Sequence, residues 1–390
     1  MFKDFCNNPV MIVSYYFPPL NFPRSIRIKF LLRTFQRIGK KVICLTAHLD
    51  NWGIDKTLTD MHGAEVIKAQ SHLFRRSIRI HILPHYYLGW SLVPLLKGLV
   101  TARRIHPSYV FGIGMPFNSP VIAYLISKIT MRPLIIELGD PWSLNPDPVE
   151  HPIGVFNVKI MRMIERAVFT QADAVYVTTD KVLDDYSRLY PSIANRFHIS
   201  RNGFSSEAMN QALPVPLPGN GIKILFLGAH WTGRISIEPL REAIKILRAQ
   251  GMEIQALFVG LFDDKLCSEG LIHMENMEFG TALGMMKSAD ILLTYATVAG
   301  SLIPSKTYWY LSTGRPTLII IDGHDVMEKE FRSFPTMNII QNNTDEIMLA
   351  IRKLIVMKKI DVGPIERYDL DITMEKYIRN LDSIVEEVVG

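Results

Sequence analysis

The stretch "SLIPSKTYWYLSTGRPTLIII", from Ser301 to Ile321, decides how the rest of the chain is interpreted. It begins as a polar loop, continues as a short helix pattern that stops at Gly314, and ends in a run of branched aliphatic residues. An entirely apolar strand next to a helix is typical of a parallel sheet that is covered on both faces. The stretch therefore predicts a helix over 305–312, a strand over 316–321 and an α/β fold.

The same alternation of strand and helix patterns continues on both sides of this stretch. The expected strands are 10–17, 41–47, 65–69, 109–114, 133–138, 174–179, 222–228, 254–260 and 290–295, and the expected helices are 25–39, 88–105, 119–130, 157–172, 181–190, 238–250 and 281–288. Aliphatic strands separated by helices indicate doubly wound, Rossmann-like domains. Ligands of such domains bind beyond the carboxyl ends of the strands.

The length of 390 residues favours two domains rather than one. The pattern lapses over 206–221, which is rich in proline and glycine and is expected to be a linker. We therefore expect an N-terminal domain over 1–205 and a second domain over 222–365. Residues 366–390 form a helical segment that is expected to pack back on the first domain.

Charge and cysteine content limit the classes of function. The three cysteines, Cys6, Cys44 and Cys267, lie far apart without the spacing of a metal site, which favours a reducing compartment and no bound metal. The net charge is +5, and we expect no nucleic acid partner. Two basic clusters, 74–83 and 101–107, are either solvated faces or sites of attraction to an anionic membrane or a phosphorylated ligand.

The stretch "YYLGWSLVPLLKGLVTA" (86–102) is the most membrane-like segment of the chain. Pro94 and Lys97 interrupt it, and it is shorter than the ~20 residues that a membrane-spanning helix needs. It is either a buried helix or an interfacial one that gives peripheral membrane contact. We expect no spanning helix, no signal peptide in Met1 to Pro9, and a cytoplasmic protein that reaches the inner face of the membrane.

Two corners of the second domain carry residues suited to binding phosphate. Gly228 follows a strand and permits close approach of a ligand, and Arg234 lies before the next helix, although a tight turn with a surface arginine is the alternative. Ser305 is expected to cap a helix whose first turn contains Lys306 and Thr307. A lysine at that end opposes the helix dipole unless an anion is bound there.

Four segments, in order along the chain, resemble bacterial GT-B glycosyltransferases of the family 4 type. They are "MIVSYYFPPLNFPRSIRIKFLLRTFQRIGKKVICLTA" (11–47), "IIELGDPWSLNP" (135–146), "ISRNGFSSE" (199–207) and "IPSKTYWYLSTGRPTL" (303–318). The resemblance implies two Rossmann-like domains facing a central cleft, with the acceptor over the first domain and a nucleotide-sugar held mostly by the second. It also implies a retaining transfer without a metal ion or separate cofactor, to a glycan or lipid-linked acceptor, in assembly of envelope polysaccharide or lipopolysaccharide.

The chain departs from this family at one pair of positions. Where the family has two glutamates eight positions apart, this chain has Ser301 and Trp309. A glutamate accepts two hydroxyl hydrogens, whereas tryptophan can only stack or donate one N–H. Either Trp309 contacts the nucleoside by stacking, or the protein is a GT-B pseudoenzyme that acts as a binding partner; a GT-B nucleotide-sugar epimerase is a third alternative.

Five residues of the first domain are candidates for substrate binding and catalysis. Pro19, Arg24 and Arg27 follow the strand over 10–17 and are expected to bind substrate. The two arginines are expected to contact acceptor or donor phosphate, although a solvated helix face is the alternative for Arg27. Glu137 and Asp140 end the strand over 133–138, where an acid can accept the proton of the acceptor hydroxyl. For Asp140 the alternative is a cap on the following turn.

Overall fold

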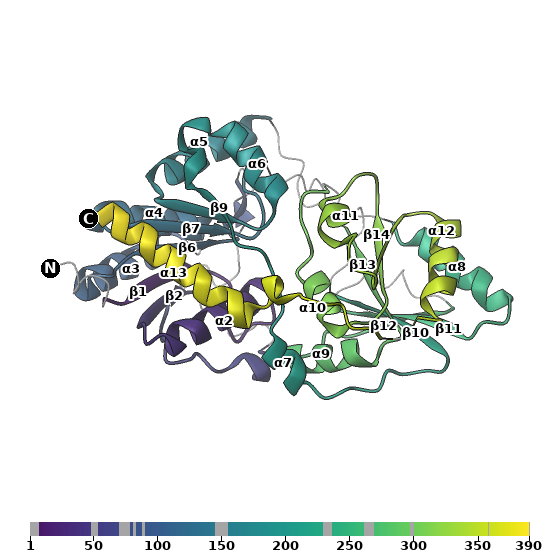
Figure 1. Cartoon of the computed structure of the whole chain (residues 1–390). Helices are drawn as coiled ribbons and strands as arrows, with labels where there is room; N and C mark the ends of the chain where they lie inside the picture. The colour runs from purple at the N-terminus through teal and green to yellow at the C-terminus, as the bar shows by residue number, and fades with distance from the viewer. Residues whose placement is uncertain are drawn as a thin grey trace. The chain divides into compact units, whose positions relative to one another are not determined.

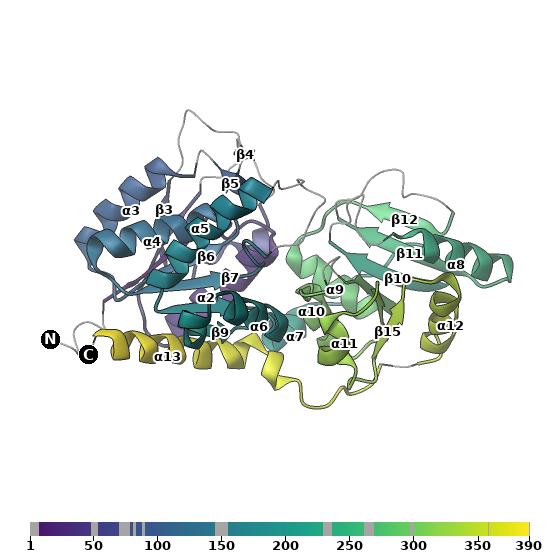
Figure 2. The same cartoon turned by 90° about the horizontal axis from the view of Figure 1, so that it is seen from above.

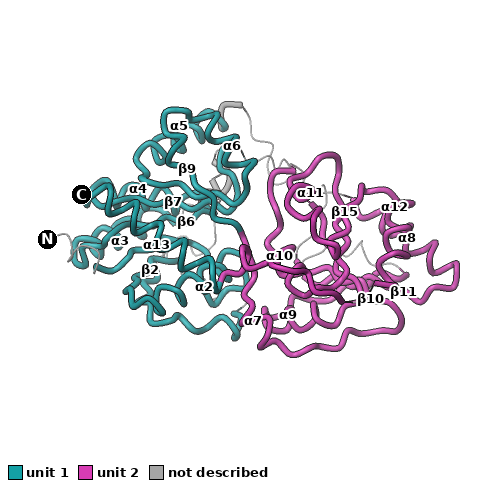
Figure 3. The backbone as a smooth tube through the Cα atoms, in the orientation of Figure 1, with its two compact units in different colours: residues 1–201, 371–390 teal, residues 202–370 magenta. Residues whose placement is uncertain are grey.

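The structure, a computed structural model, describes residues 8–47, 54–69, 79–80, 83–87, 90–144, 155–228, 236–260, 269–296, 300–357 and 359–389. The chain divides into two compact units, shown in teal and magenta in Figure 3. Unit 1 contains residues 1–201 and 371–390, and unit 2 contains residues 202–370. Unit 1 is therefore discontinuous in sequence, whereas unit 2 is a single segment.

Unit 1 is built on a parallel sheet with the strand order β3-β2-β1-β6-β7-β8-β9 (Figure 1). The strands are β1 (Val10–Ser14), β2 (Val42–Thr46), β3 (Glu65–Lys68), β6 (Val110–Gly114), β7 (Leu134–Leu138), β8 (Ala174–Val177) and β9 (Phe197–Ile199). The helices are α2 (Pro23–Arg37), α3 (Leu92–Ile105), α4 (Asn118–Thr130), α5 (Val155–Gln171), α6 (Asp180–Leu189) and α13 (Leu370–Val389). A short antiparallel pair, β4 (Arg79–Ile80) and β5 (Leu83–Tyr87), lies outside this sheet.

The order of the strands reverses at β1, which pairs with β2 on one side and β6 on the other. All five residues of β1 are buried, because helices cover both faces of the sheet. The helix α13 runs along unit 1, as Figures 1 and 2 show, and its Asn380 donates to the hydroxyl of Tyr176 on β8 at 2.8 Å. The point of reversal is where sheets of this type bind ligands.

Unit 2 repeats the same plan with six parallel strands in the order β12-β11-β10-β13-β14-β15. The strands are β10 (Ile222–Leu227), β11 (Ile254–Val259), β12 (Leu271–Met274), β13 (Ile291–Tyr295), β14 (Thr317–Ile321) and β15 (Met337–Gln341). The helices are α7 (Ser206–Gln211), α8 (Glu238–Ala249), α9 (Phe279–Ser288), α10 (Lys306–Thr313), α11 (Val326–Phe331) and α12 (Thr344–Leu354). Its order reverses at β10, between β11 and β13.

The predicted fold class, two Rossmann-like α/β domains, is confirmed. The strand expected over 10–17 ends at Ser14, where the chain turns toward the Pro18–Pro19 loop, and the helix expected over 88–105 has described helical residues from Leu92. The segment 206–221, expected as a linker, instead contains α7 and belongs to unit 2, where Val215 N donates to Gly284 O at 3.1 Å.

Among the described residues, no helix combines the length and the apolar composition that crossing a bilayer requires.

The sequence patterns did not predict several elements that the structure contains. These are β9, β12, β15, α7, α11 and α12.

The loop after β7 is fixed by the buried carboxylate of Glu165 on α5. Four donors contact it: the backbone N–H and hydroxyl of Ser143, both at 2.7 Å, and the hydroxyls of Tyr186 at 3.0 Å and Tyr190 at 2.7 Å. Next to Ser143, the indole of Trp142 stacks on Phe117 with 4.9 Å between ring centroids. Glu165 therefore anchors this loop, rather than only its own helix.

We expect Glu165→Gln to lower the free energy of unfolding by about 1–3 kcal/mol. The NH2 group of glutamine replaces one accepting oxygen, so the donors that face it lose their acceptor. Chemical denaturation followed by circular dichroism measures this. Glu275→Gln, at an exposed position of unit 2, is the matched control and is expected to unfold like the parent. Equal stability of both variants would contradict the anchoring role.

Candidate functional site

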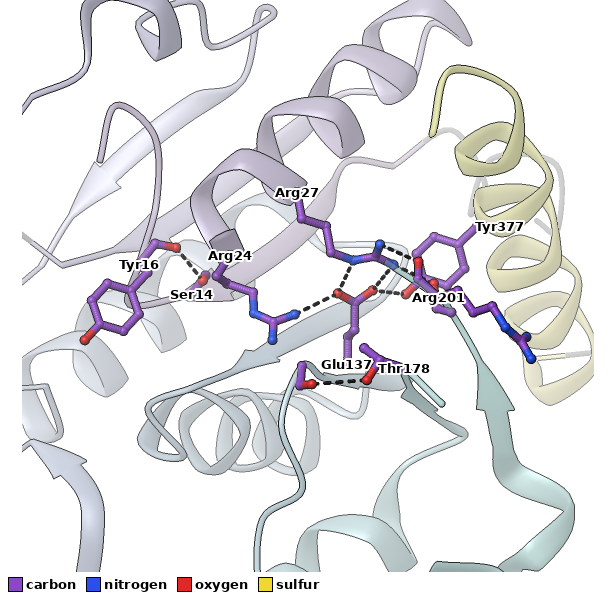
Figure 4. Close-up of polar contacts among 10 residues, drawn as sticks. Ser14, Tyr16, Arg24, Arg27, Glu137, Thr178, Arg201 and Tyr377 are labelled. Atoms are coloured by element: carbon purple, nitrogen blue, oxygen red, sulfur yellow. Dashed lines mark hydrogen bonds and ion pairs between the residues drawn. The ribbon is translucent and has the colours of Figure 1, made fainter. Parts of the chain in front are cut away.

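In unit 1 the candidate residues gather at the carboxyl ends of β1 and β7. Helix α2 begins with Pro23, a residue suited to the first helical position because it has no N–H to satisfy. Arg24 and Arg27 are three positions apart and so lie on one side of the helix. Figure 4 shows both guanidinium groups directed at Glu137, which comes from β7.

Arg27 is buried and forms a bidentate ion pair with Glu137. Its Nε and Nη2 atoms lie 2.8 and 3.2 Å from the two carboxylate oxygens (Figure 4). Its remaining donors reach the hydroxyl of Ser200 at 2.6 Å and the carbonyl of Arg201 at 3.0 Å. Arg27 is therefore neither on a solvated helix face nor directed at a substrate, and the structure gives it an internal role.

Glu137 receives a further hydrogen bond from the hydroxyl of Tyr377 on α13, at 2.7 Å. The carboxylate is 2% exposed. Burial opposes its charge, but the two arginines and the tyrosine hydroxyl outweigh burial and hold the pKa of Glu137 below its ordinary value of 4.5. A carboxylate stabilised in this way is a poor proton acceptor, so the geometry disfavours the catalytic role expected of Glu137.

Arg24 is placed differently from Arg27. Within the described part of the chain, its guanidinium has a single hydrogen bond, to Glu137 at 3.5 Å, although its side chain is only 13% exposed. It lies over Gly139, where an added methyl group would meet its Nη2 atom at 0.9 Å, so only glycine leaves room for it. An arginine with most of its five donors uncommitted suits an anionic group of a substrate.

Asp140 and Pro19 complete this region. Asp140 is half-buried and directly follows Gly139. Burial lowers the pKa of Arg24, and the negative charges of Glu137 and Asp140 offset part of that effect. Pro19 is half-buried in the loop after β1, and its carbonyl accepts from Asp55 N at 2.9 Å. Arg24 and Asp140 are the pair in unit 1 that the ion pair of Arg27 leaves available.

In unit 2 the structure brings Lys306 to Gly228, although 78 positions separate them in the sequence. The ammonium of Lys306 donates to Leu227 O at 2.7 Å and lies 3.2 Å from the ring centroid of Phe226. Gly228 has a φ of 121° and carries no side chain. A Cβ atom added to it would lie 3.5 Å from the ammonium nitrogen of Lys306. The N–H of Gly228 itself donates to Val259 O at 2.9 Å. A positive charge therefore lies beside a position without a side chain at the carboxyl end of β10, the strand where the order of the sheet reverses.

Helix α10 is joined to β10 by a second hydrogen bond. Leu227 N donates to the hydroxyl of Tyr310 at 3.1 Å, one turn after Lys306. Both backbone groups of Leu227 are therefore bound by side chains of α10. This fixes the distance between the helix start and the strand end, so the ammonium of Lys306 is held in place rather than swinging freely.

At the start of α10 the cap expected at Ser305 is wrong, whereas the donor contacts expected of Thr307 and Trp309 stay predictions. Ser305 has helical backbone angles, and its side chain forms no capping hydrogen bond, because Thr307 N already donates to Pro304 O. Thr307 is fully buried, and its hydroxyl has no partner among the described residues. Trp309 is 5% exposed and packs edge-on against Phe279, so it presents no open face on which a nucleoside could stack.

Arg234 lies outside the described residues, and its predicted contact with phosphate stays a prediction. Sequence reasoning missed Phe226, Tyr310 and Tyr377, each of which holds a predicted residue in place. Their signal in the sequence is weak, because an aromatic residue in an apolar strand or helix is ordinarily part of the core.

We expect Glu137→Gln to destabilise the protein by about 3–5 kcal/mol, because it leaves the buried charge of Arg27 unpaired. The low pKa of Glu137 means that its contribution is complete above about pH 4.5 and is lost as the pH falls below that value. The stability of the variant is therefore less sensitive to acid in that range. Thermal unfolding at several pH values measures both effects, with Glu387→Gln on the exposed side of α13 as control; parallel pH profiles would contradict the assignment.

No family model and no curated protein matches this chain. Solved structures match its fold. HepE of Anabaena, in complex with UDP-glucose, gives a TM-score of 0.65 at 14% identity and covers 96% of this chain and 99% of that chain. A glycosyltransferase from Rickettsia africae gives 0.65 at 11% identity over 97% and 99%, and a UDP-GlcNAc 2-epimerase from Methanocaldococcus jannaschii gives 0.58 at 12% identity over 96% and 99%.

At these identities the likeness concerns the fold, and it does not single out the family 4 type. The match runs along almost the whole of both chains, so it includes both units and not only one Rossmann-like sheet. The chain has the GT-B fold, in which glycosyltransferases and sugar epimerases that act on nucleotide-sugars are both found.

Proposed function

We propose that this protein transfers a sugar from a nucleoside-diphosphate sugar to a polysaccharide or lipid-linked glycan acceptor, with retention of configuration. The observation that carries the proposal is the ammonium of Lys306 beside Gly228 at the end of β10. Charge grows on the diphosphate as the sugar leaves, and a fixed cation stabilises that charge. The absence of a side chain at Gly228 leaves room for the diphosphate to approach it. The sequence resemblance supports an enzyme of the family 4 type. Such an enzyme would act in envelope glycan assembly at the cytoplasmic face of the membrane.

Each unit contributes its own proposed roles. Lys306 and Gly228 contact the diphosphate together with Arg234, and the donor is held by these cations and backbone amides without a metal ion or separate cofactor. Arg24 contacts an anionic group of the substrates in unit 1. Asp140 receives the proton of the acceptor hydroxyl, a role that Glu137 cannot share while two arginines hold its charge.

The buried position of Trp309 favours a second candidate, a GT-B pseudoenzyme that binds a partner or a glycan without turnover. The position at which the family resembled by the sequence has the second of its two glutamates is here an indole packed on Phe279. Calorimetry with uridine and guanosine diphosphate separates the candidates, since saturation at micromolar concentration supports the transferase. The epimerase alternative predicts interconversion of the sugar without an acceptor, which product analysis of the same reactions detects.

We expect Lys306→Met to lower kcat/KM for the nucleotide-sugar by on the order of 10²-fold, because the aliphatic stem stays on Phe226 while the charge is lost. Donor hydrolysis and transfer across a panel of nucleotide-sugars measure this. Lys329→Met, at an exposed position of α11, is the control and should retain full activity. Parent activity in Lys306→Met, with an unchanged melting temperature, would remove Lys306 from the site.

Arg24→Gln is expected to reduce kcat/KM about tenfold to hundredfold, since a hydrogen bond to a charged group contributes about 1.5–3 kcal/mol. Gly139→Ala is expected to give a similar loss, because its methyl group displaces the guanidinium. Arg37→Gln, exposed on the same helix, is the control. A full rate in Arg24→Gln would show that this arginine only supports the fold.

A further inference from the structure

Helix α3 exposes three large apolar side chains to solvent. Leu92, Leu96 and Val100 are 65%, 54% and 69% exposed, and they follow one another at intervals of four residues. The other exposed residues of the helix are Lys97, Arg103 and Arg104. At 3.6 residues per turn, these six positions fall within an arc of about 140°. They are called the α3 face below.

The opposite side of α3 is lined by small or compact residues. Pro94, Gly98, Thr101 and Ala102 are the buried positions of the helix. A methyl group on Gly98 would lie 2.4 Å from Cδ1 of Ile126 on α4, so the two helices approach too closely for larger side chains; Figure 2 shows them side by side. An amphipathic helix of a globular protein usually buries its leucines. Leu92 and Leu96 depart from this rule, whereas Leu95 and Leu99 are half-buried.

The charge around this helix is mostly positive, although Glu65 of β3 lies 3.4 Å from Nη2 of Arg104. Between Val66 and Ile136 the sequence contains nine lysines and arginines and no aspartate or glutamate. Because the net charge of the whole chain is +5, the remaining residues together carry −4. Both basic clusters predicted from the sequence, 74–83 and 101–107, therefore belong to a stretch without acids, and α3 lies in the middle of it.

We propose that the α3 face docks on an anionic membrane surface, with α3 lying in the plane of the headgroups. The apolar row enters the boundary between headgroups and acyl chains, and the basic residues beside it contact anionic headgroups. A second copy of the chain is a poorer occupant, because a symmetric dimer would bring the same basic residues of both copies together. Docking on lipid does not depend on transferase activity, and either proposal can fail without the other.

Flotation of the full chain with lipid vesicles tests the proposal. The protein is expected to float with vesicles of phosphatidylcholine and phosphatidylglycerol, to stay at the bottom with phosphatidylcholine alone, and to be released by high salt. The triple variant Leu92→Ser, Leu96→Ser, Val100→Ser and the single variant Arg103→Glu are each expected to weaken partitioning about tenfold or more. Because these side chains are exposed, the variants keep the melting temperature of the parent.

Matched controls lie in unit 2. Leu349→Ser with Val356→Ser removes apolar side chains that are 69% and 77% exposed, and Lys329→Glu reverses an exposed charge; both are expected to float like the parent. Failure of the parent to float with anionic vesicles overturns the proposal. So does equal flotation of the triple variant and its control, or a dimer in solution that the triple variant converts to monomer.

Discussion

A buried ion pair between Arg27 and Glu137 organises the carboxyl edge of the first sheet. It joins the helix after β1 to the end of β7, and Tyr377 adds α13 to the same carboxylate. Removing either partner would leave an uncompensated charge away from water, which costs more than the intact pair contributes. The pair is therefore a constraint on the fold, and it determines which neighbouring groups remain available for substrates.

Arg24 and Asp140 owe their availability to that pair. Glu137 is already satisfied by Arg27, so the second arginine is held near it by a long contact and by the space above Gly139. In unit 2, side chains also fix a cation at the end of a strand. Tyr310 and Lys306 bind the backbone of Leu227 at the end of β10 and hold the ammonium there. Each unit thus fixes one positive charge near the point where its strand order reverses.

The sequence predicted the fold because apolar periodicity reports burial directly, and both sheets consist of such runs. It also singled out Lys306, since a lysine in the first turn of a helix is locally unfavourable and needs an explanation; its contact with a diphosphate stays a prediction. It failed at Glu137 and Arg27, because their pairing spans 110 positions and the contact with Tyr377 spans 240. A single glutamate in the apolar strand "LIIEL" indicates that the buried carboxylate has a hydrogen-bonding or ionic partner. The local sequence does not show which residue that partner is.

The sequence-based prediction of a cap at Ser305 was wrong for a different reason. The N–H of Thr307 donates to the carbonyl of Pro304, and residue types alone do not reveal such a backbone hydrogen bond. The outward leucines of α3 were also beyond reach, since periodicity shows which residues share a face but not which face is covered. Only the close approach at Gly98 settles that orientation.

The discontinuity of unit 1 has a consequence for how the chain is made. Unit 2 is contiguous, and all of it leaves the ribosome before α13 does. Until α13 arrives, Glu137 lacks the hydroxyl of Tyr377, and Tyr176 lacks the amide of Asn380. Domains generally fold as units during synthesis. The first unit therefore stays incompletely packed while unit 2 is synthesised, and its core is completed only when α13 adds its contacts.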